Sequence, residues 1–336
     1  MAKACFLVFL FVVGNFTASA KEPVTVAIIE TLPVSIVTDS REAFEQELTR
    51  IMPNHEITFQ LYNAQGSEAQ AIKILDQMAQ QPMPDLILSV ATLATRALNA
   101  SDAFLDVPKL FMAVAAPIEE GIVSEYGEVS ARNITGESHV LDAKVKLDML
   151  DGLLRTSSSG TPLKIGLLHS TYPSSTIAVR QLMAIEDQYA NIELIDISTP
   201  YLEGDGSLEK MTDGIVSALK SQAHQLDGYW LSTGPLVESS RLISRVRRET
   251  GLLPLFAEKI STVKDGALLG VVSAPKSIGK SAARKAKRIL LQQEVGDIPV
   301  VKMDTYTVAV NVSTAIALQL PIPSNYLKLA KNHVYQ

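Results

Sequence analysis

The chain has 336 residues, of which 36 are acidic and 30 are basic, and its formal net charge is −6. A mildly acidic protein is poorly suited to nucleic acid, whose binding depends on the neutralisation of phosphates. Charged residues make up 20% of the chain, beside 18 glycines and 16 prolines, so the composition is that of a globular protein and not of a disordered one. The length suits two domains of ordinary size.

The first 20 residues predict a secretory signal peptide. Lys3 supplies the positive start, residues 4–13 form an apolar run too short to span a bilayer, and Ala18-Ser19-Ala20 fits a small-x-small cleavage site. The mature chain should begin near Lys21, and an uncleaved anchor is the alternative. The single cysteine, Cys5, lies inside the apolar run, so we expect no disulfide, no cysteine-based metal site and no lipid-modified N-terminus. We therefore expect a free periplasmic protein.

Strands and helices alternate through the first half of the chain. Short apolar or alternating runs predict strands at 24–29, 56–62, 86–90 and 109–114. Apolar residues at helical spacing predict helices at 39–52, 67–80 and 92–99. Ser67 opens the second of these helices with the spacing of a capping box, and Thr92 is a predicted N-cap of the third. Residues 133–136 are interpreted as a connection.

The second half repeats this order of elements. A helix at 143–154 and a serine- and glycine-rich break at 157–160 precede a new series. Its predicted strands lie at 165–169, 192–197, 228–232 and 255–256, and its helices at 175–189, 206–224 and 235–249. A strand at 267–272, a helix at 278–292, an extended segment at 305–310 and a short helix from Ser313 complete the chain. Strands that alternate with helices predict parallel sheets, and the repeated order predicts two related α/β lobes.

Small polar residues follow several of these strands. Ligands of open parallel sheets bind outside the carboxyl ends of the strands, where the free N–H groups of helix starts also lie. The hydroxyls at these places that could bind a ligand are Thr92, Ser170, Ser175, Ser232 and Thr233. Simple helix capping is the alternative for each of them.

Four further side chains could face a ligand. Thr31 ends the first strand, and Tyr172 could stack on a ligand ring or be a partly buried loop residue. Glu137 and Glu258 could meet a cationic group or be ordinary surface residues. The five histidines lack metal-ligand spacing, and neither a Gly-x-Ser-x-Gly elbow nor a Walker phosphate loop occurs in the sequence. We therefore predict no enzyme activity, no metal and no cofactor.

A series of short segments occurs in a fixed order along the chain. They are Tyr62-Asn63-Ala64-Gln65-Gly66-Ser67, Asp85-Leu86-Ile87 with Ala91-Thr92, Pro108 with Phe111 and Ala116-Pro117, Asn133-Ile134-Thr135-Gly136, Lys164-Ile165-Gly166, Pro254-Leu255-Phe256-Ala257, and Asn311-Val312-Ser313-Thr314-Ala315 with Pro321-Ile322-Pro323. With them the chain, from about Val24 to Ala330, resembles the substrate-binding proteins of bacterial ABC transporters that are related to tryptophan- and tyrosine-binding lipoproteins.

The resemblance implies a type I periplasmic-binding fold. In this fold two Rossmann-like lobes with parallel sheets are joined by a three-segment hinge, and they close on a ligand between them. The crossovers implied here are 133–136, 271–275 and 305–310, and Ser273 lies in the second of them. The implied domains are a signal peptide at 1–20, a first lobe of 21–136 plus 274–304, and a second lobe of 137–273 plus 305–336.

The chain departs from its relatives at two places. Many of them carry Thr-Asp-Pro where this chain has Ala115-Ala116-Pro117, and a Thr-Asp pair where it has Ser232-Thr233-Gly234-Pro235. Carboxylates are natural partners of a ligand ammonium, so their loss predicts weak binding of unmodified tryptophan, tyrosine and phenylalanine. An uncharged or anionic ligand with an aromatic part is favoured, unless Glu258 or Glu137 replaces the missing charge. Ala116 is kept among the candidate ligand-binding residues.

The predicted function is that of a monomeric periplasmic protein that captures a small molecule and delivers it to an ABC permease in the inner membrane. It needs no cofactor and no nucleic acid. One alternative is a ligand-sensing module for a membrane signalling receptor, which has the same fold and a different partner. Another is a periplasmic hydrolase that depends on Ser170 or Ser232.

Overall fold

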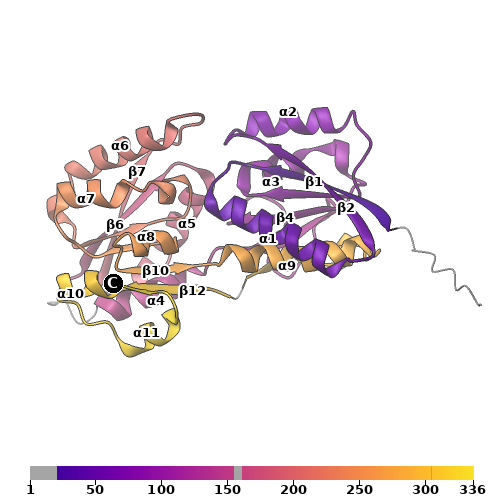
Figure 1. The fold of residues 1–336 in the computed structure, drawn as a ribbon. Coiled ribbons are helices and arrows are strands. Elements are labelled where there is room, and N and C mark those ends of the chain that lie inside the picture. Colours follow the sequence, from indigo (N-terminus) through magenta and orange to yellow (C-terminus); the bar gives the residue numbers. More distant parts are fainter. Residues whose placement is uncertain (1–20, 155–160, 304) are drawn as a thin grey trace, which may run out of the picture.

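The computed structural model describes residues 21–154, 161–303 and 305–336, so the predicted signal peptide and the predicted break at 157–160 lie outside the described residues. Two α/β lobes lie side by side, each built on its own sheet (Figure 1). Within the described ranges, no helix is long and apolar enough to cross a membrane.

The first lobe contains a six-stranded sheet in the order β11-β5-β4-β3-β1-β2. All of its neighbouring strands pair in parallel. The strands are β1 (Glu22–Glu30), β2 (His55–Asn63), β3 (Leu86–Val90), β4 (Lys109–Val114), β5 (Ile134–Ser138) and β11 (Val301–Lys302). The central strands β3 and β4 are buried along their whole length, as expected of parallel strands that are covered on both faces.

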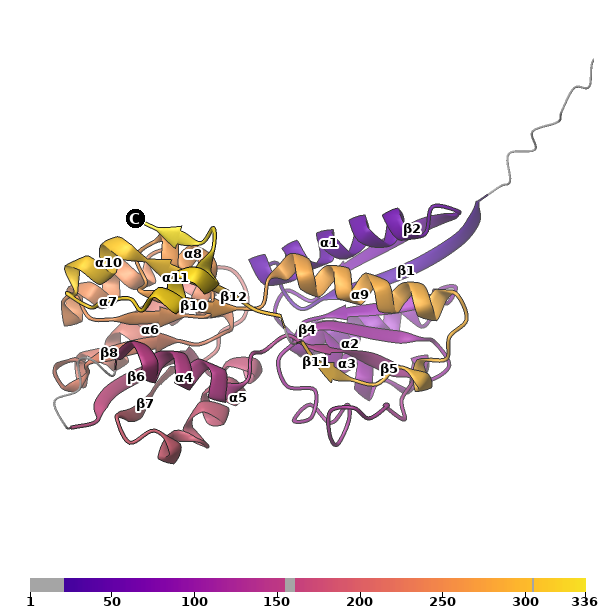
Figure 2. The ribbon, with the colours of Figure 1, turned by 90° about the horizontal axis from the view of Figure 1, so that it is seen from below.

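Helices cover both faces of this sheet. α1 (Ser35–Ile51) and α9 (Pro275–Leu290) lie side by side on one face, where Phe44 and Ile278 are buried with β1 residues such as Ile28 (Figure 2). The two helices approach closely because Gly279 has no side chain, and a Cβ atom there would collide with the carbonyl oxygen of Ser40. α2 (Glu68–Met78) and α3 (Thr92–Ala100), followed by η1 (Asp102–Phe104), cover the other face.

The second lobe contains a seven-stranded sheet in the order β13-β12-β10-β9-β8-β6-β7. Its strands are parallel except that β12 runs antiparallel to β10. They are β6 (Leu163–Ser170), β7 (Ile192–Thr199), β8 (Gly228–Leu231), β9 (Leu255–Ala257), β10 (Leu269–Val272), β12 (Thr307–Asn311) and β13 (Val334–Tyr335).

Two groups of helices cover the second sheet. α4 (Ala143–Leu154), α5 (Pro173–Met183) and the C-terminal helices α10 (Val312–Ala317) and α11 (Ser324–Ala330) contribute to one core. α6 (Ser207–Lys220), α7 (Leu242–Thr250) and α8 (Ile260–Lys264) contribute to the other. The short helices η3 (Glu186–Gln188), η4 (Ala223–Gln225), η5 (Pro235–Glu238) and η6 (Val295–Asp297) lie in connections.

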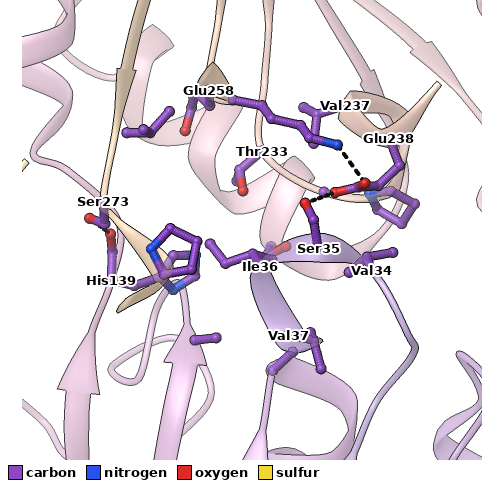
Figure 3. A pocket seen from close by; sticks show the side chains of 18 of the residues that line it. Val34, Ser35, Ile36, Val37, His139, Thr233, Val237, Glu238, Glu258 and Ser273 are labelled. Atoms are coloured by element: carbon purple, nitrogen blue, oxygen red, sulfur yellow. Dashed lines mark hydrogen bonds and ion pairs between the residues drawn. The ribbon is translucent and has the colours of Figure 1, made fainter. Parts of the chain in front are cut away.

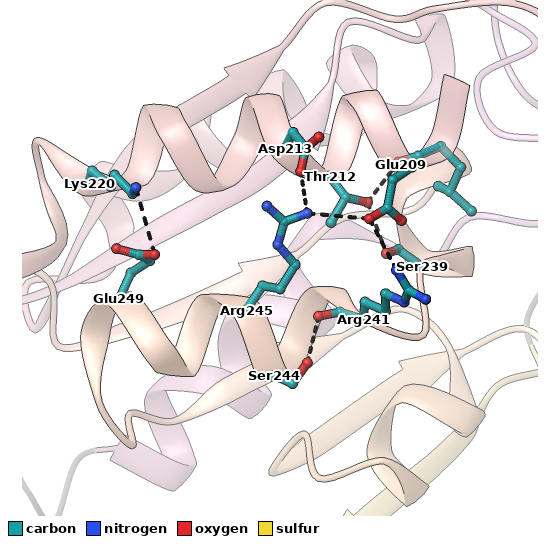
Figure 4. Close-up of polar contacts among 10 residues, drawn as sticks. Glu209, Thr212, Asp213, Lys220, Ser239, Arg241, Ser244, Arg245 and Glu249 are labelled. Atoms are coloured by element: carbon teal, nitrogen blue, oxygen red, sulfur yellow. Dashed lines mark hydrogen bonds and ion pairs between the residues drawn. The ribbon is translucent and has the colours of Figure 1, made fainter. Parts of the chain in front are cut away.

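Ion pairs join α6 and α7 on the outside of the second lobe (Figure 4). Arg245 pairs with Asp213 and with Glu209, and the Arg245 Nη1 lies 3.7 Å from the Glu209 Oε1. Lys220 pairs with Glu249 at 3.9 Å. These surface pairs align the two helices, and each adds at most about 1 kcal/mol to stability.

The structure corrects several of the predicted elements. The predicted helices 175–189 and 206–224 end earlier, at Met183 and Lys220, and a short helix, η3 or η4, follows each of them. The segment 133–136, predicted to be a connection, is mostly part of β5, which pairs with β4 and β11 in the first sheet. The predicted helix 235–249 is divided into η5 and α7. Most of the predicted crossover 305–310 belongs to β12, which completes the second sheet after the chain has left β11.

The chain therefore passes between the sheets after β5, between β10 and α9, and between β11 and β12. In Figure 1, α9 lies among the indigo elements of the first lobe although it is late in the sequence. The exact domain boundaries stay a proposal, and the continuation of β5 to Ser138 in the first sheet favours a boundary after that residue.

Candidate functional site

A cavity of about 400 Å³ lies between the lobes. The first lobe contributes the β1–α1 loop with the first turn of α1, and also Ala91, Thr92 and Ala113. The second lobe contributes residues that follow β6, β8 and β9, as Figure 3 shows for Thr233 and Glu258. The cavity thus lies at the carboxyl ends of the strands of both sheets, and its volume is in the usual range of about 300–1,000 Å³ for ligand pockets.

Thr92 lies on the cavity wall and is almost fully buried. The sequence predicts it as the N-cap of α3, but it is the first helical residue, after Ala91 with a φ of 69°. The capping hydroxyl comes instead from Thr31, which accepts a hydrogen bond of 3.0 Å from the Ala94 N–H and donates one of 3.1 Å to the Val90 carbonyl oxygen. Thr31 therefore joins β1 to the start of α3 and does not line the cavity.

The second-lobe wall is built from the ends of β6 and β8. Tyr172 and Thr233 line the cavity. Ser175 lies behind them and donates a hydrogen bond of 2.7 Å to the Thr233 carbonyl oxygen. Ser170 and Ser232 are also buried outside the cavity wall, and their hydroxyls have no hydrogen-bond partner among the described residues.

Glu258 lines the cavity, but both of its oxygens are occupied. One accepts from Lys146 Nζ at 2.8 Å and the other from the Trp230 indole N–H at 2.9 Å. The side chains of Lys146 and Glu258 are only 2% and 7% exposed, so the pair is desolvated and electrically balanced. No sequence pattern indicates this pairing, because Lys146 lies on α4 and Glu258 follows β9.

A second charge pair borders the cavity near α1. Glu238 accepts a hydrogen bond of 2.8 Å from the Ser35 hydroxyl of the first lobe and pairs with Lys259 at 2.6 Å (Figure 3). Sequence reasoning misses Ser35 because it predicts that the helix begins at Asp39. Ser35 follows the first strand, so the rule of polar residues at strand ends would find it if the helix start were placed correctly.

His139 and Ser273 reach the cavity from the segments between the lobes. Ser273 donates a hydrogen bond to the backbone carbonyl of His139. Burial lowers the pKa of His139 to about 4, so its imidazole is neutral near pH 7. Ser273 is a predicted site residue. His139 is not, because the sequence analysis considered the histidines only as possible metal ligands.

The other two predicted site residues lie away from the cavity. Ala116 packs in a small apolar cluster with Ala115, Val140 and Ile177. Glu137 forms an ion pair with Lys285 of α9. Of the predicted set, Thr92, Tyr172, Thr233, Glu258 and Ser273 line the cavity. A role of any of them in binding stays a prediction.

This geometry agrees with comparisons to known proteins. The sequence model of the family described as "ABC transporter substrate binding protein" matches residues 41–334. The chain belongs to this family.

A curated protein to which the chain is similar is the tyrosine-binding protein of Clostridioides difficile (strain R20291). It is 28% identical over 269 residues, which are 74% of this chain and 71% of that protein.

Solved structures of other proteins share the fold. A conserved domain protein from Vibrio cholerae has a TM-score of 0.77 at 20% identity, over 93% of this chain and 99% of that one. An ABC domain from Streptococcus pneumoniae in complex with L-Trp has a TM-score of 0.75 at 18% identity, over 93% and 100% of the two chains. These likenesses confirm the predicted α/β fold of type I periplasmic-binding proteins with two mostly parallel sheets.

Proposed function

We propose that this substrate-binding protein captures a small molecule in the cavity between its lobes and delivers it to an ABC permease. The observation that carries the proposal is the cavity itself, which both lobes line at the carboxyl ends of their strands. The predicted signal peptide supports a periplasmic location, where a permease of the inner membrane is the natural partner.

Contacts between the lobes support a mechanism of closure. The Ser35 hydroxyl donates to Glu238, the Tyr201 hydroxyl donates to the Gly66 carbonyl at 2.9 Å, and the Gln181 amide donates to Glu119 at 2.8 Å. Each net hydrogen bond contributes about 0.5–1.5 kcal/mol, so these contacts together hold the closed form by only a few kcal/mol. A ligand that touches both walls then favours the closed form by its difference in affinity for the two forms.

The rival functions receive less support. Ser170 and Ser232, on which the hydrolase hypothesis depends, lie outside the cavity wall. The sensory hypothesis uses the same capture step and differs only in the membrane protein that reads the closed form.

Native mass spectrometry of the protein, purified from periplasm without refolding, tests the capture step. We expect a bound small molecule, and a mature N-terminus near Lys21. Tyrosine and tryptophan are the first ligands to screen, since relatives are named for or solved with them. Deletion of the gene should then abolish uptake of the bound solute. Unchanged uptake would contradict delivery to a permease and favour the sensory hypothesis.

A further inference from the structure

Resting on the proposed function, we infer that the cavity takes an uncharged, mainly apolar solute with one or two hydrogen-bonding groups, and neither a free amino acid nor another ion. The state of the charged groups on the wall supports this ligand class.

The charged side chains among the described residues that line the cavity are Asp39, Glu238, Glu258 and Lys259. Lys259 neutralises Glu238 at 2.6 Å, and Lys146 neutralises Glu258 at 2.8 Å. Asp39 is exposed to solvent. A ligand ammonium or carboxylate that leaves water for the cavity would meet no free buried counter-charge, and its desolvation would go uncompensated.

The two places where the sequence departs from its relatives, one on the wall and one away from it, also lack room for a new carboxylate. Gly234 has a φ of 119°, and a Cβ atom there would collide with the hydroxyl of Ser175. Ala116 is enclosed in the apolar cluster that joins β4 to α5. A longer side chain at either place would have to displace its neighbours, so the absence of a carboxylate is built into the packing.

Three helix starts beside the cavity also offer fewer hydrogen-bond donors to a ligand carboxylate. Three helices beside the cavity, α5, η5 and α9, begin with Pro173, Pro235 and Pro275. Proline has no backbone N–H, so each of these helix starts lacks one of its free donors. These three helix starts therefore offer a ligand carboxylate fewer backbone donors than helix starts without proline, which agrees with an uncharged ligand.

The remaining wall suits an apolar body with neutral polar groups. Ile36, Val37 and Val237 provide apolar surface. Thr92, Thr233 and the neutral imidazole of His139 line the same cavity. A neutral imidazole offers one donor and one acceptor, and a hydroxyl can donate or accept. An alcohol, phenol or amide carried on a ring or a branched chain matches these groups.

Calorimetry on the mature protein, with one series of differently charged probes on an indole ring and one on a phenol ring, tests the inference. The probes are L-tryptophan (zwitterion), tryptamine (cation), indole-3-acetate (anion) and indole-3-ethanol (neutral), beside tyrosine, tyramine, 4-hydroxyphenylacetate and tyrosol. A thermal-shift library sorted into the same four charge classes extends the series to other skeletons. We expect the tightest ligand to be neutral, and to bind at least about tenfold more tightly than its charged analogues.

Two outcomes would overturn the inference in different ways. If an ion or zwitterion binds most tightly, the ligand class is wrong and the capture function stands. If no class binds, the capture function itself fails, and the inference fails with it.

A double variant tests whether the buried Lys146–Glu258 pair contributes to ligand binding. Glu258→Gln combined with Lys146→Met removes the buried pair together, and the new glutamine side chain keeps an acceptor for the Trp230 indole N–H. The dissociation constant of the neutral ligand should change by less than about threefold, because no net charge was used to bind it. If the affinity for the neutral ligand falls about tenfold or more while the circular dichroism stays native, Glu258 holds the ligand. Ile36→Asn, which alters the apolar wall, is the matched control and should weaken the same ligand.

Discussion

Replacing Ser35 by alanine should open the cavity without unfolding the protein. The change removes the hydrogen bond of 2.8 Å from the Ser35 hydroxyl to Glu238, which joins the lobes. Ser35 is the first residue of α1, whose N-cap Val34 makes no side-chain cap, so alanine costs the helix nothing. A half-buried hydrogen bond to a carboxylate contributes about 1–1.5 kcal/mol to the closed form, so ligand affinity should fall about five- to tenfold.

Calorimetry on a double-mutant cycle measures this contact. Ser35→Ala and Glu238→Gln should show a coupling energy in ligand binding, while the free energy of unfolding stays nearly unchanged. Thr49→Ala is the matched control, because its hydroxyl lies on the same helix and, among the described residues, donates only to the Glu45 carbonyl oxygen at 2.8 Å. If Ser35→Ala and Thr49→Ala have equal effects on affinity, the contact with Glu238 does not support closure.

Three further predictions concern stability. Gly234→Ala should lower the free energy of unfolding, measured by chemical denaturation, by about 1–3 kcal/mol more than Gly204→Ala. Both positions have positive φ, but only Gly234 lacks space for a Cβ atom. Equal losses of stability in the two variants would contradict this argument. Lys146→Met alone leaves Glu258 buried and unpaired, and should cost about 3–5 kcal/mol that the added change Glu258→Gln largely restores; no loss in the single variant would show that the pair is not desolvated. Burial lowers the pKa of Lys109 to about 8 from 10.5, so the unfolded chain binds more protons between these pH values, and stability rises with pH across that window. Unfolding at pH 7 and pH 10 should show a smaller rise in Lys109→Met than in the wild type, and an equal rise would refute the role of this lysine.

Much of the fold could be predicted because most strands of the two sheets are short apolar runs. β3 and β4 have the predicted bounds, since buried parallel strands are apolar along their whole length. β5 was not predicted as a strand, because Ile134–Ser138 contains a glycine and polar residues and has no strand pattern of its own. It forms through pairing with β4 and β11, where Gly136 lies against Phe111. Such tertiary pairing cannot be seen in one local segment.

The site could be predicted only in part for a similar reason. Strand ends identified Thr92, Thr233 and Glu258, which line the cavity. The same rule could not tell that Ser170 and Ser232 lie behind the wall, because side-chain direction at a strand end depends on the loop that follows.

The charge pairs that border the cavity could not be predicted from the sequence. Lys146 and Glu258 are far apart along the chain and meet only when α4 packs beside β9, so the free carboxylate expected from the sequence is an occupied one.

A crystal structure of the protein purified from periplasm without refolding tests the central claim most directly. If no solute co-purifies, the crystal should be grown with the tightest ligand of the charge-class screen. The account predicts one uncharged solute between Thr92 of the first lobe and Thr233 of the second, with the Lys146–Glu258 pair intact. A solute bound to one lobe alone, outside this cavity, would contradict the account.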